Sequence, residues 1–579
     1  MAGRTLALER VSRHLERLID IGIHLAEEKD QKVLLRKVLA AASEMSGATM
    51  GVIFLRDDKG TLRAAESMGI PFSGSMPLFD LNHPERDPDS MAIRTALSGM
   101  TQVSDDILKD PRKEMDRARQ RAKEAGVEVR SAVSLAMRTD EQPAVGVMQL
   151  YNATDPDSGK ICAFTESHIS YLESLARQAA VVLEHQKLVA SQDHMLDALV
   201  RTLGEAIDAK SEFTGRHCVR VPELAMMLAY EAQSVSSGPL AEFSFRTEDQ
   251  WREFRTGAWL HDCGKITTPE HLLDKATKLE TVYNRLHEIR TRFEVLLRDG
   301  RIEVLQAQID GYMDAETAAY VHAQRLQELR EDYAFVARCN VGSEGMPVED
   351  VERLISLSQK RWWRHFDDQL GLSWLETELR SRDQHLPLPV SEPLIADKPW
   401  HLIPRSVQLQ RDLTDGFSME VPEYLYNHGE LYSLSVLRGT LTPEERFKIN
   451  EHIIHTLRML EGAQFPSHLR RVPEYAGTHH ETMDGRGYPR GLNAEQLSVP
   501  ARIMAIADIF EALTAADRPY KTPKPLSESL RILQSLKNKG KIDPDLFELF
   551  LKSGVYRRYA ERFLQAGQID VTDISPYLD

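Results

Sequence analysis

The chain has few cysteines and no long apolar run. Its 579 residues include only four cysteines, and none of them stands in a CxxC pair. This scarcity argues against a disulfide framework and a zinc ribbon, and it fits a reducing compartment. No stretch approaches the roughly 20 apolar residues of a membrane-spanning helix, and the charged N-terminal segment is unlike a signal peptide. We therefore expect a cytoplasmic protein without a membrane span.

An excess of positive charge is also absent. Asp and Glu number 88 against 72 Lys and Arg, which gives a formal net charge of −16. Such a chain has no global field to collect DNA or RNA, so we expect no nucleic-acid partner. A polyanionic substrate would need a local basic or metallic site. Length alone suggests about three or four domains.

The first region, residues 17–188, has the pattern of an α+β domain. A helical pattern over Leu15–Met45 is followed by ATMGVIFLRDDKGTLRAA, which predicts a hairpin that turns at Asp57–Gly60. The runs SAVSLAMRT and AVGVMQLYN predict two more strands. The region resembles a GAF domain, chiefly through GVIFLRDDKGTL and AVGVMQLYN. The resemblance implies a regulatory role and a small-molecule ligand. The sequence reveals neither the identity of this ligand nor whether it activates or inhibits.

Residues 164–204 predict a connecting helix. Apolar residues recur there in alternating steps of four and three, with two polar interruptions. The positions are Leu175, Ala179, Val182, Gln186, Val189, Asp193, Leu196, Val200 and Leu203. The pattern fits an ordinary packed helix or a coiled coil of about three to four heptads. The coiled coil would make the protein a homodimer.

Residues 288–438 are charged and predicted to be helical, and they end in the proline-rich run LPLPVSEPLIADKPWHLIP. We find no catalytic motif there. Trp362 and Trp363, flanked by Arg361 and Arg364, could stack on a nucleotide, although packing or an interface is the more common use of tryptophan. The role of this segment is open.

Two short motifs carry acids and bases that favour a metal site. In GAWLHDCGK, His261 and Asp262 end an apolar run, and a buried carboxylate is costly unless it is paired or binds metal. In HHETMDGRGYP, His479 and His480 are neighbours. Helical neighbours point about 100° apart, so both reach one centre only if it holds two metals or the backbone bends. These motifs indicate a binuclear site.

Two helical segments supply further candidates. ARIMAIADIFEALTAADRPYK predicts an apolar helix that carries Asp508, a carboxylate in need of a cation. In LTPEERFKINEH, Thr442 is the predicted N-cap, with Pro443 at the first helical position and Glu445 as capping-box partner. That helix would carry His452, which taken alone is more typical of a structural histidine.

These motifs, in this order, resemble the HD-GYP domain, the branch of the HD metallohydrolases that hydrolyses cyclic di-GMP. The resemblance covers about residues 200–287 and 435–540, and HHExxDGxGYP is its most specific element. It implies an all-helical catalytic domain over residues 200–579, interrupted by an insertion at about 288–438. It also implies two or three divalent ions, iron or manganese.

The resemblance assigns a set of metal ligands. They are His261, Asp262, His452, His479, His480 and Asp508, with His217 in SEFTGRHCVRV as an additional candidate. Asp262 would bridge two ions, since it has two oxygens. Trinuclear members carry a glutamate four residues before the histidine at position 217; here Phe213 stands there, which argues against a third ion. His287 would be a non-ligand, because the family's spacing is met by Leu441 and His452.

Catalytic and substrate-binding roles follow from the same resemblance and from charge. Asp262 and Lys265 would be catalytic, with Lys265 binding a phosphate oxygen or protonating the leaving group. The residues expected to contact the substrate are Gly485, Gly487, Tyr488, Pro489, Arg518 and Lys521. The glycines allow close backbone approach, the tyrosine and proline offer a wall for guanine, and the two cations suit phosphate.

The sequence thus predicts a multidomain protein, a GAF-regulated phosphodiesterase that hydrolyses cyclic di-GMP to pGpG, GMP or both. One alternative is a non-catalytic scaffold that binds cyclic dinucleotides. Another is an HD-type hydrolase of a different nucleotide, because the fold alone does not determine the substrate.

Overall fold

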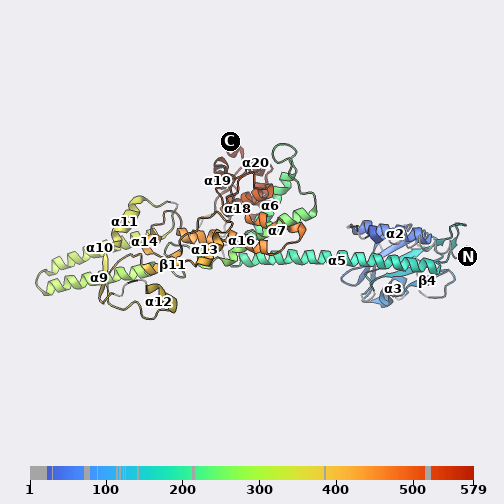
Figure 1. Cartoon of the computed structure of the whole chain (residues 1–579), viewed down its shortest axis with the longest axis horizontal. Coiled ribbons are helices and arrows are strands. Elements are labelled where there is room, and N and C mark those ends of the chain that lie inside the picture. Colours follow the sequence, from blue (N-terminus) through green and yellow to red (C-terminus); the bar gives the residue numbers. More distant parts are fainter. Residues whose placement is uncertain are drawn as a thin grey trace. The chain divides into compact units, whose positions relative to one another are not determined.

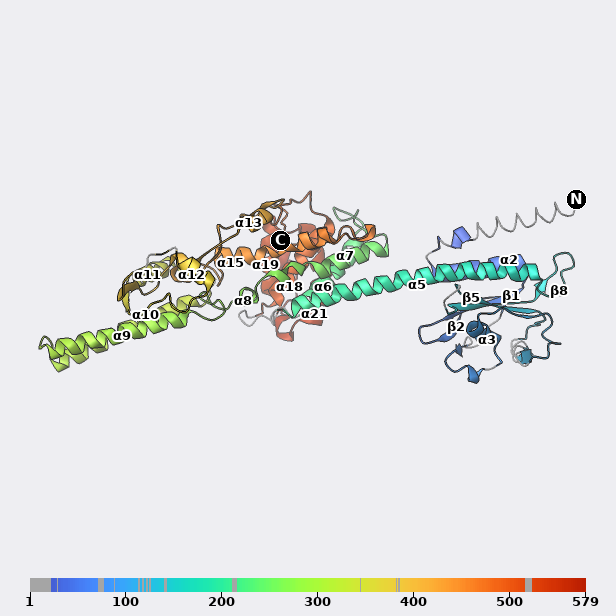
Figure 2. The same ribbon diagram turned by 60° about the horizontal axis from the view of Figure 1, so that its bottom comes forward.

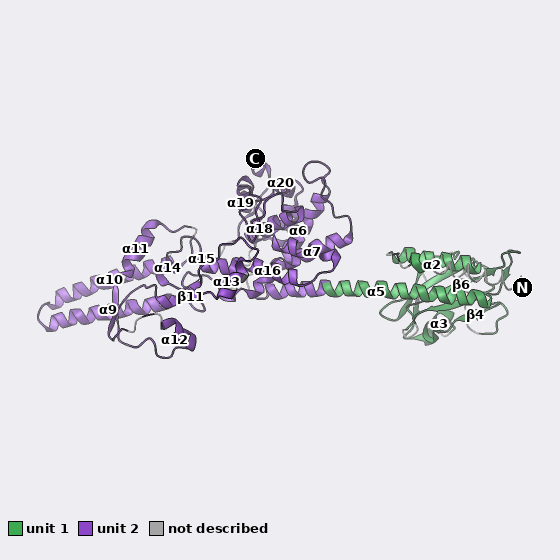
Figure 3. Ribbon diagram, in the orientation of Figure 1, with its two compact units in different colours: residues 1–196 green, residues 197–579 purple. Residues whose placement is uncertain are grey.

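The computed structural model describes residues 22–70, 78–210, 216–515 and 523–578, apart from positions 26, 29, 88, 113–114, 117–118, 121–122, 124–125, 140–142, 344, 382 and 384–385. The chain divides into two compact units, residues 1–196 and 197–579, whose boundary falls inside one long helix (Figure 3). Of the helices in the described ranges, none combines the length and apolar character needed to cross a membrane.

The first unit is built on a six-stranded antiparallel sheet with the order β3-β2-β1-β6-β5-β4. β1 (Met50–Arg56) and β2 (Thr61–Met68) form the predicted hairpin. Asp57 Oδ1 holds its turn by accepting hydrogen bonds from the backbone N–H groups of Lys59 and Thr61. The other strands are β3 (Leu78–Asp80), β4 (Gln102–Ser104), β5 (Ala132–Met137) and β6 (Gly146–Tyr151), and β7 (Ala153–Thr154) pairs separately with β8 (Ile161–Cys162).

Helices cover both faces of this sheet. α2 (Gln31–Ser46) and the first part of α5 (Glu166–Asp208) pack on one face, and α3 (Met91–Ser98) packs on the other (Figure 2). Asp30 is the N-cap of α2, and its carboxylate accepts hydrogen bonds from the backbone N–H groups of Lys32 and Val33. Much of the helical pattern predicted before α2 lies outside the described residues. The arrangement confirms the predicted α+β class.

A single helix, α5, runs through the range expected for the connecting helix. Two residues of the apolar seam, Leu175 and Ala179, are fully buried in the core of the first unit. Gln186, a polar interruption of the seam, donates a hydrogen bond to the backbone oxygen of Glu28 at 2.7 Å. The early part of the seam therefore packs within its own unit.

The second unit has an all-helical core, which confirms the predicted fold class. One buried apolar cluster is shared by α6 (His217–Gln233), α7 (Glu248–Leu260), α18 (Val499–Thr514), α19 (Leu526–Asn538), α20 (Pro544–Lys552) and α21 (Val555–Phe563). α17 (Val472–Gly477) packs against α7, and α16 (His452–Gly462) packs against α17 and the segment after α7. This packing brings the motifs of the sequence together.

The predicted capping box starts α15 (Pro443–Asn450). Thr442 Oγ1 accepts a hydrogen bond from the backbone N–H of Glu445, and Glu445 Oε2 accepts one from the backbone N–H of Thr442. The helix ends at Asn450, however, and His452 begins the separate helix α16. The single helix expected from the sequence is therefore two.

The region between α8 (Glu270–Leu273) and α15 begins with two long antiparallel helices, α9 (Leu286–Ile309) and α10 (Ala315–Asn340), which lie side by side (Figure 1). Shorter helices follow: α11 (Val348–Ser358), α12 (Trp374–Arg380), α13 (Val407–Thr414) and α14 (Glu430–Leu434). Two small antiparallel sheets pair β9 (Arg361–Arg364) with β10 (Val390–Pro393), and β11 (Leu402–Pro404) with β12 (Tyr424–Asn427). β10 and β11 lie in the proline-rich run, where no regular helix was expected. β9 and β12 lie outside that run and were not predicted.

A buried ion pair joins the beginning of this region to α15. Lys275 Nζ donates to both carboxylate oxygens of Glu445, at 2.7 and 2.8 Å, and each side chain is 2% exposed. Burial lowers the pKa of Lys275. Removing one charge of such a pair is costly, because its partner stays buried without compensation.

We predict that Glu445→Ala lowers the free energy of unfolding of the second unit by about 3–5 kcal/mol. The double variant Lys275→Met, Glu445→Leu should recover most of this loss, since it removes both charges and keeps the volume. Urea unfolding followed by tryptophan fluorescence measures this unit alone, because all six tryptophans lie in it. Equal losses in the two variants would contradict the prediction.

Candidate metal centre

Three histidines of the second unit are oriented by the same kind of hydrogen bond. In each ring Nδ1–H donates to the backbone oxygen three residues earlier: His261 to Ala258 at 2.8 Å, His452 to Ile449 at 2.6 Å, and His479 to Ala476 at 2.8 Å. This bond puts the ring proton on Nδ1 and leaves the lone pair of Nε2 available to a cation. All three residues are at most 2% exposed.

Asp262 lies between these rings and is itself 2% exposed. Its Oδ2 is 3.2 Å from His217 Nε2 and 3.3 Å from His261 Nε2. Its Oδ1 is 3.2 Å from His452 Nε2 and 4.0 Å from His479 Nε2. One oxygen thus faces each of two imidazole pairs, which is the arrangement that a carboxylate needs to bridge two cations.

Asp508 and His217 meet on one side of Asp262. Asp508 Oδ1 is 3.3 Å from His217 Nε2 and 3.8 Å from His261 Nε2. His217 Nδ1 donates to Glu511, which also accepts a hydrogen bond from Arg220 Nε at 2.7 Å. Glu511 therefore turns Nε2 of His217 toward the centre.

His480 follows His479 in the turn after α17. The two rings lie 4.2 Å apart at 48°, and the His480 ring stacks on Tyr488 at 4.8 Å and 25°. Burial and the neighbouring histidines lower the pKa of both imidazoles, to about 4 for His479. Both rings are therefore neutral at pH 7, the form that binds metal.

Lys265 is the cation nearest to Asp262, with 2.5 Å between Nζ and Oδ2. Burial would lower the pKa of Lys265, but the Asp262 carboxylate outweighs it and raises that pKa. Burial would likewise raise the pKa of Asp262, but Lys265 and the histidines lower it well below its usual value. Both groups are therefore charged at neutral pH.

The structure brings all seven predicted ligands together. They are His217, His261, Asp262, His452, His479, His480 and Asp508, and they form three overlapping groups in which the donor atoms lie within 4.8 Å of one another. Within the described part of the chain, the buried Nε2 atoms of His452 and His479 have no hydrogen-bond partner. Buried polar atoms without a partner are costly unless a cation takes the lone pair. Imidazole and carboxylate donors suit divalent transition metals.

Several curated proteins are similar to part of this chain. It is 43% identical over 126 residues to a cyclic di-GMP phosphodiesterase of Thermotoga maritima, covering 21% of this chain and 33% of that protein. It is 34% identical over 150 residues to a 3'3'-cGAMP-specific phosphodiesterase of Vibrio cholerae (24% and 33%). It is 37% identical over 134 residues to a cyclic di-GMP phosphodiesterase of Pseudomonas aeruginosa (23% and 31%). The chain thus spans about a third of the length of these relatives.

Two family models also match the chain. The model of the GAF domain matches residues 28–184, and the model of the HD domain matches residues 389–546. The chain therefore carries a match to a GAF domain in its first unit and a match to an HD domain in its second. The HD match contains the last four of the seven predicted ligands and begins after His261 and Asp262. His261 and Asp262 therefore precede the inserted region in the sequence, and the fold brings them next to the residues that follow it.

The glycine-rich loop of the HD domain lies directly beside the centre through Tyr488 and His480. Gly485 has a φ of +71°, which disfavours other residues. A Cβ at Gly487 would lie 2.4 Å from the backbone nitrogen of Thr482, so only glycine fits there. Pro489 is buried, and its backbone oxygen accepts a hydrogen bond of 2.7 Å from the backbone N–H group of Ser418.

The two carboxylates of HHETMDGRGYP hold this loop. Glu481 accepts hydrogen bonds from the backbone N–H groups of Arg490 and Leu492, at 2.6 and 2.9 Å. Asp484 is exposed and accepts hydrogen bonds from within its own turn. Arg518 and Lys521, the predicted phosphate contacts, lie outside the described residues.

Sequence reasoning missed Glu511 and Arg220, which orient His217. A signal for both was present, because Glu511 stands three residues after Asp508 and Arg220 three after His217. Residues at this spacing share a helix face. The pairing itself could not be predicted, since it requires α6 and α18 to pack together.

We predict that Gly264→Ala disrupts the centre. A Cβ there would lie 1.9 Å from the backbone oxygen of His452 and 2.6 Å from the backbone nitrogen of Thr456. The start of α16 would have to move, and we expect a loss of about 1–3 kcal/mol in stability, as for other overpacked sites. Metal analysis and thermal melting should show a lower metal content and a lower Tm.

Gly462→Ala is the matched control, because Gly462 lies in α16, the helix that the Gly264→Ala variant would displace. A Cβ at Gly462 meets no described atom within 4 Å, so metal content and Tm should be unchanged. Normal metal content in Gly264→Ala would show that the close contact does not position His452.

Proposed function

We propose that this chain is a metal-dependent phosphodiesterase that hydrolyses a cyclic dinucleotide, cyclic di-GMP first, to pGpG, GMP or both. The observation that carries the proposal is the convergence of five histidines and two aspartates, with two buried Nε2 atoms that lack a hydrogen-bond partner in the described structure. The activities after which the relatives are named support the substrate class. They include both cyclic di-GMP and 3'3'-cGAMP enzymes, so the second substrate is included in the test.

The seven side chains would hold two divalent ions, iron or manganese, with Asp262 between them. When bound, such ions neutralise charge on phosphoryl oxygens and lower the pKa of water. Lys265 keeps its proton because Asp262 raises its pKa. Its Nζ would donate to a phosphate oxygen or to the leaving oxygen, where negative charge grows.

The glycine-rich loop would bind the nucleotide. Gly485 and Gly487 let the backbone approach closely, and Tyr488 with Pro489 would form a wall for guanine next to His480. We propose that Arg518 and Lys521 bind the phosphate groups of the substrate, as predicted from the sequence. The GAF domain would regulate turnover through a small-molecule ligand. The cytoplasm fits as the compartment, because all four cysteines are free thiols.

We expect the anaerobically purified chain to hydrolyse cyclic di-GMP with about two bound metal ions per chain. Asp262→Ala should lose its bound metal, and its rate of hydrolysis should fall about a hundredfold or more. This loss exceeds the roughly 10- to 100-fold effect of changing a residue that only supports a metal ligand. Turnover of cyclic di-GMP and 3'3'-cGAMP, measured by chromatography beside metal analysis, checks both effects.

The exposed His287 supplies the matched control, because it stands at the start of α9 and is not among the converging ligands. His287→Ala should keep metal and rate, whereas His452→Ala should lose both. Tight binding of cyclic di-GMP without turnover, with metals present, would replace the enzyme by a scaffold. Hydrolysis of other nucleotides alone would make it a different HD hydrolase.

We also propose that the chain forms a homodimer along α5. Three large apolar residues at seven-residue spacing are exposed on this helix: Val181 (51%), Leu188 (63%) and Met195 (65%). They form a stripe next to the predicted seam rather than on it. A heptad-spaced apolar stripe on a long helix is the surface that a second copy covers in a coiled coil.

Leu188→Glu combined with Met195→Glu should convert the dimer to a monomer, because the dimer would bury four new carboxylates. Ala190→Glu, on the opposite side of α5, should leave the dimer intact. Sedimentation equilibrium measures the mass in each case. A monomeric mass for the unaltered chain at all concentrations would contradict the dimer.

A further inference from the structure

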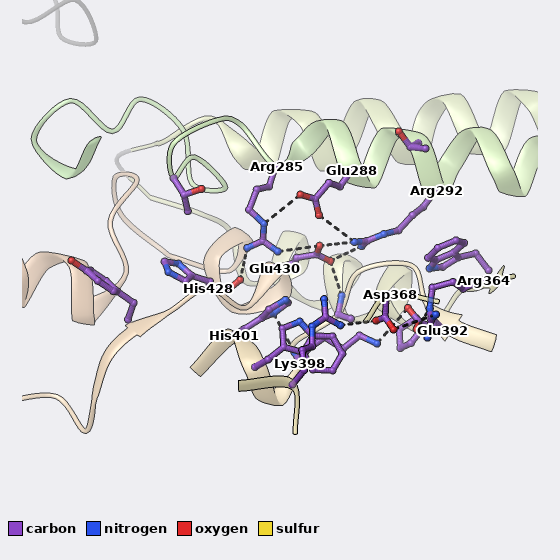
Figure 4. Close-up of a pocket in the computed structure, with 18 of the residues that line it drawn as sticks. Arg285, Glu288, Arg292, Arg364, Asp368, Glu392, Lys398, His401, His428 and Glu430 are labelled. Carbon is purple, nitrogen blue, oxygen red and sulfur yellow. Dashed lines mark hydrogen bonds and ion pairs between the residues drawn. The ribbon is translucent and has the colours of Figure 1, made fainter. Parts of the chain in front are cut away.

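A pocket of about 830 Å³ lies in the inserted region. It is bounded by α9, by β9 and β10, and by the segment from Ala396 to Glu430 (Figure 4). The described residues that line it include none of the seven metal ligands and none of the glycine-loop residues. Its volume falls within the range of about 300–1,000 Å³ that is typical of small-molecule sites. It is therefore a second candidate site.

One side of the pocket is held rigidly by Glu430, which is 1% exposed. Arg292 binds its two carboxylate oxygens at 2.7 and 2.9 Å, and Arg285 approaches one of them at 3.5 Å. The backbone N–H of Ala396 donates to the same carboxylate at 3.0 Å. Figure 4 shows these side chains pointing toward one another. The two arginines are thus used mainly to build the wall.

The other side carries cations with unused hydrogen-bond donors. Arg364 Nε donates to Glu392 at 2.8 Å, and Arg380 Nη1 donates to Asp368 at 2.6 Å. Lys398 Nζ lies 3.4 Å from Glu392. An arginine has five N–H donors and a lysine has three. Among the described residues, Arg380 and Lys398 each pair with a single carboxylate, so most of their donors stay available to an anion.

Aromatic rings accompany these cations. The guanidinium carbon of Arg380 lies 3.7 Å from the centre of the Trp400 ring, and Lys398 Nζ lies 5.2 Å from it. Trp362 and Tyr426 also line the pocket. Flat rings beside arginine and lysine are the combination by which proteins hold a base and its phosphate.

Two histidines in the pocket wall add polarity without charge. Burial, with the nearby Arg285, lowers the pKa of His401 to about 3 and that of His428 to about 4. With the two histidines neutral, the charged groups in the lining are five Lys and Arg side chains and four carboxylates. The pocket keeps a positive excess although the whole chain carries a formal charge of −16.

We propose that this pocket binds a nucleoside monophosphate. The phosphate would bind Arg380 and Lys398, and the base would stack on Trp400. Arg380 and Lys398 each pair with one carboxylate and still border an open volume of about 830 Å³. The proposal does not depend on the phosphodiesterase activity, because it concerns other residues.

Isothermal titration calorimetry on the full chain tests the proposal, with AMP and GMP as probes and with adenosine and inorganic phosphate for comparison. One nucleotide should bind per chain. Arg380→Ala and the milder Lys398→Gln should each weaken binding at least about tenfold, since each removes a charged hydrogen bond. Circular dichroism establishes that both variants are folded.

Two controls locate the site. Arg298→Ala should bind like the unaltered chain, because Arg298 is on α9 and 69% exposed, and it pairs with Glu294 outside the pocket. Asp262→Ala should also bind normally. Loss of binding in Asp262→Ala but not in the pocket variants would move the nucleotide to the metal centre and overturn the proposal. No binding at millimolar nucleotide, or inorganic phosphate binding as tightly as AMP, would also overturn it.

Discussion

The metal centre depends on one hydrogen bond that is made three times. His261, His452 and His479 each donate Nδ1–H to a carbonyl three residues earlier. Each of these carbonyls lies in the last turn of a helix, α7, α15 or α17. Carbonyl groups there lack partners within the helix, and the helix end carries a partial negative charge. Three helix ends therefore orient the rings and also favour cations at the point where the rings meet.

The convergence of the candidate ligands could be predicted from the sequence, because they stand in short motifs with family-specific spacing. The hairpin at Asp57 and the cap at Thr442 were predictable for a related reason, since both are local and each is set by a few neighbouring residues. The fold class followed from the change of apolar period between the two units.

What could not be predicted depends on contacts between distant segments. β9 and β10 pair Arg361–Arg364 with Val390–Pro393, and four-residue strands leave too short a period to recognise. The bond between Glu511 and His217 crosses from α18 to α6. The open pocket is a third case, because its cations and rings come from α9, β9, α12, β12 and the segment around Trp400, which no motif connects.

The inserted region leaves the HD domain and returns to it at almost the same place. Thr440 Oγ1 donates to the backbone oxygen of Lys275 at 3.0 Å, and bridges join Thr277 to Val341 and Ser343 to Gly439. Because its two ends lie side by side, a segment of this size can be gained, lost or exchanged in one genetic event while the helices around it keep their positions. The HD domain thus has a single point at which a different inserted segment could be attached without moving the converging histidines and aspartates.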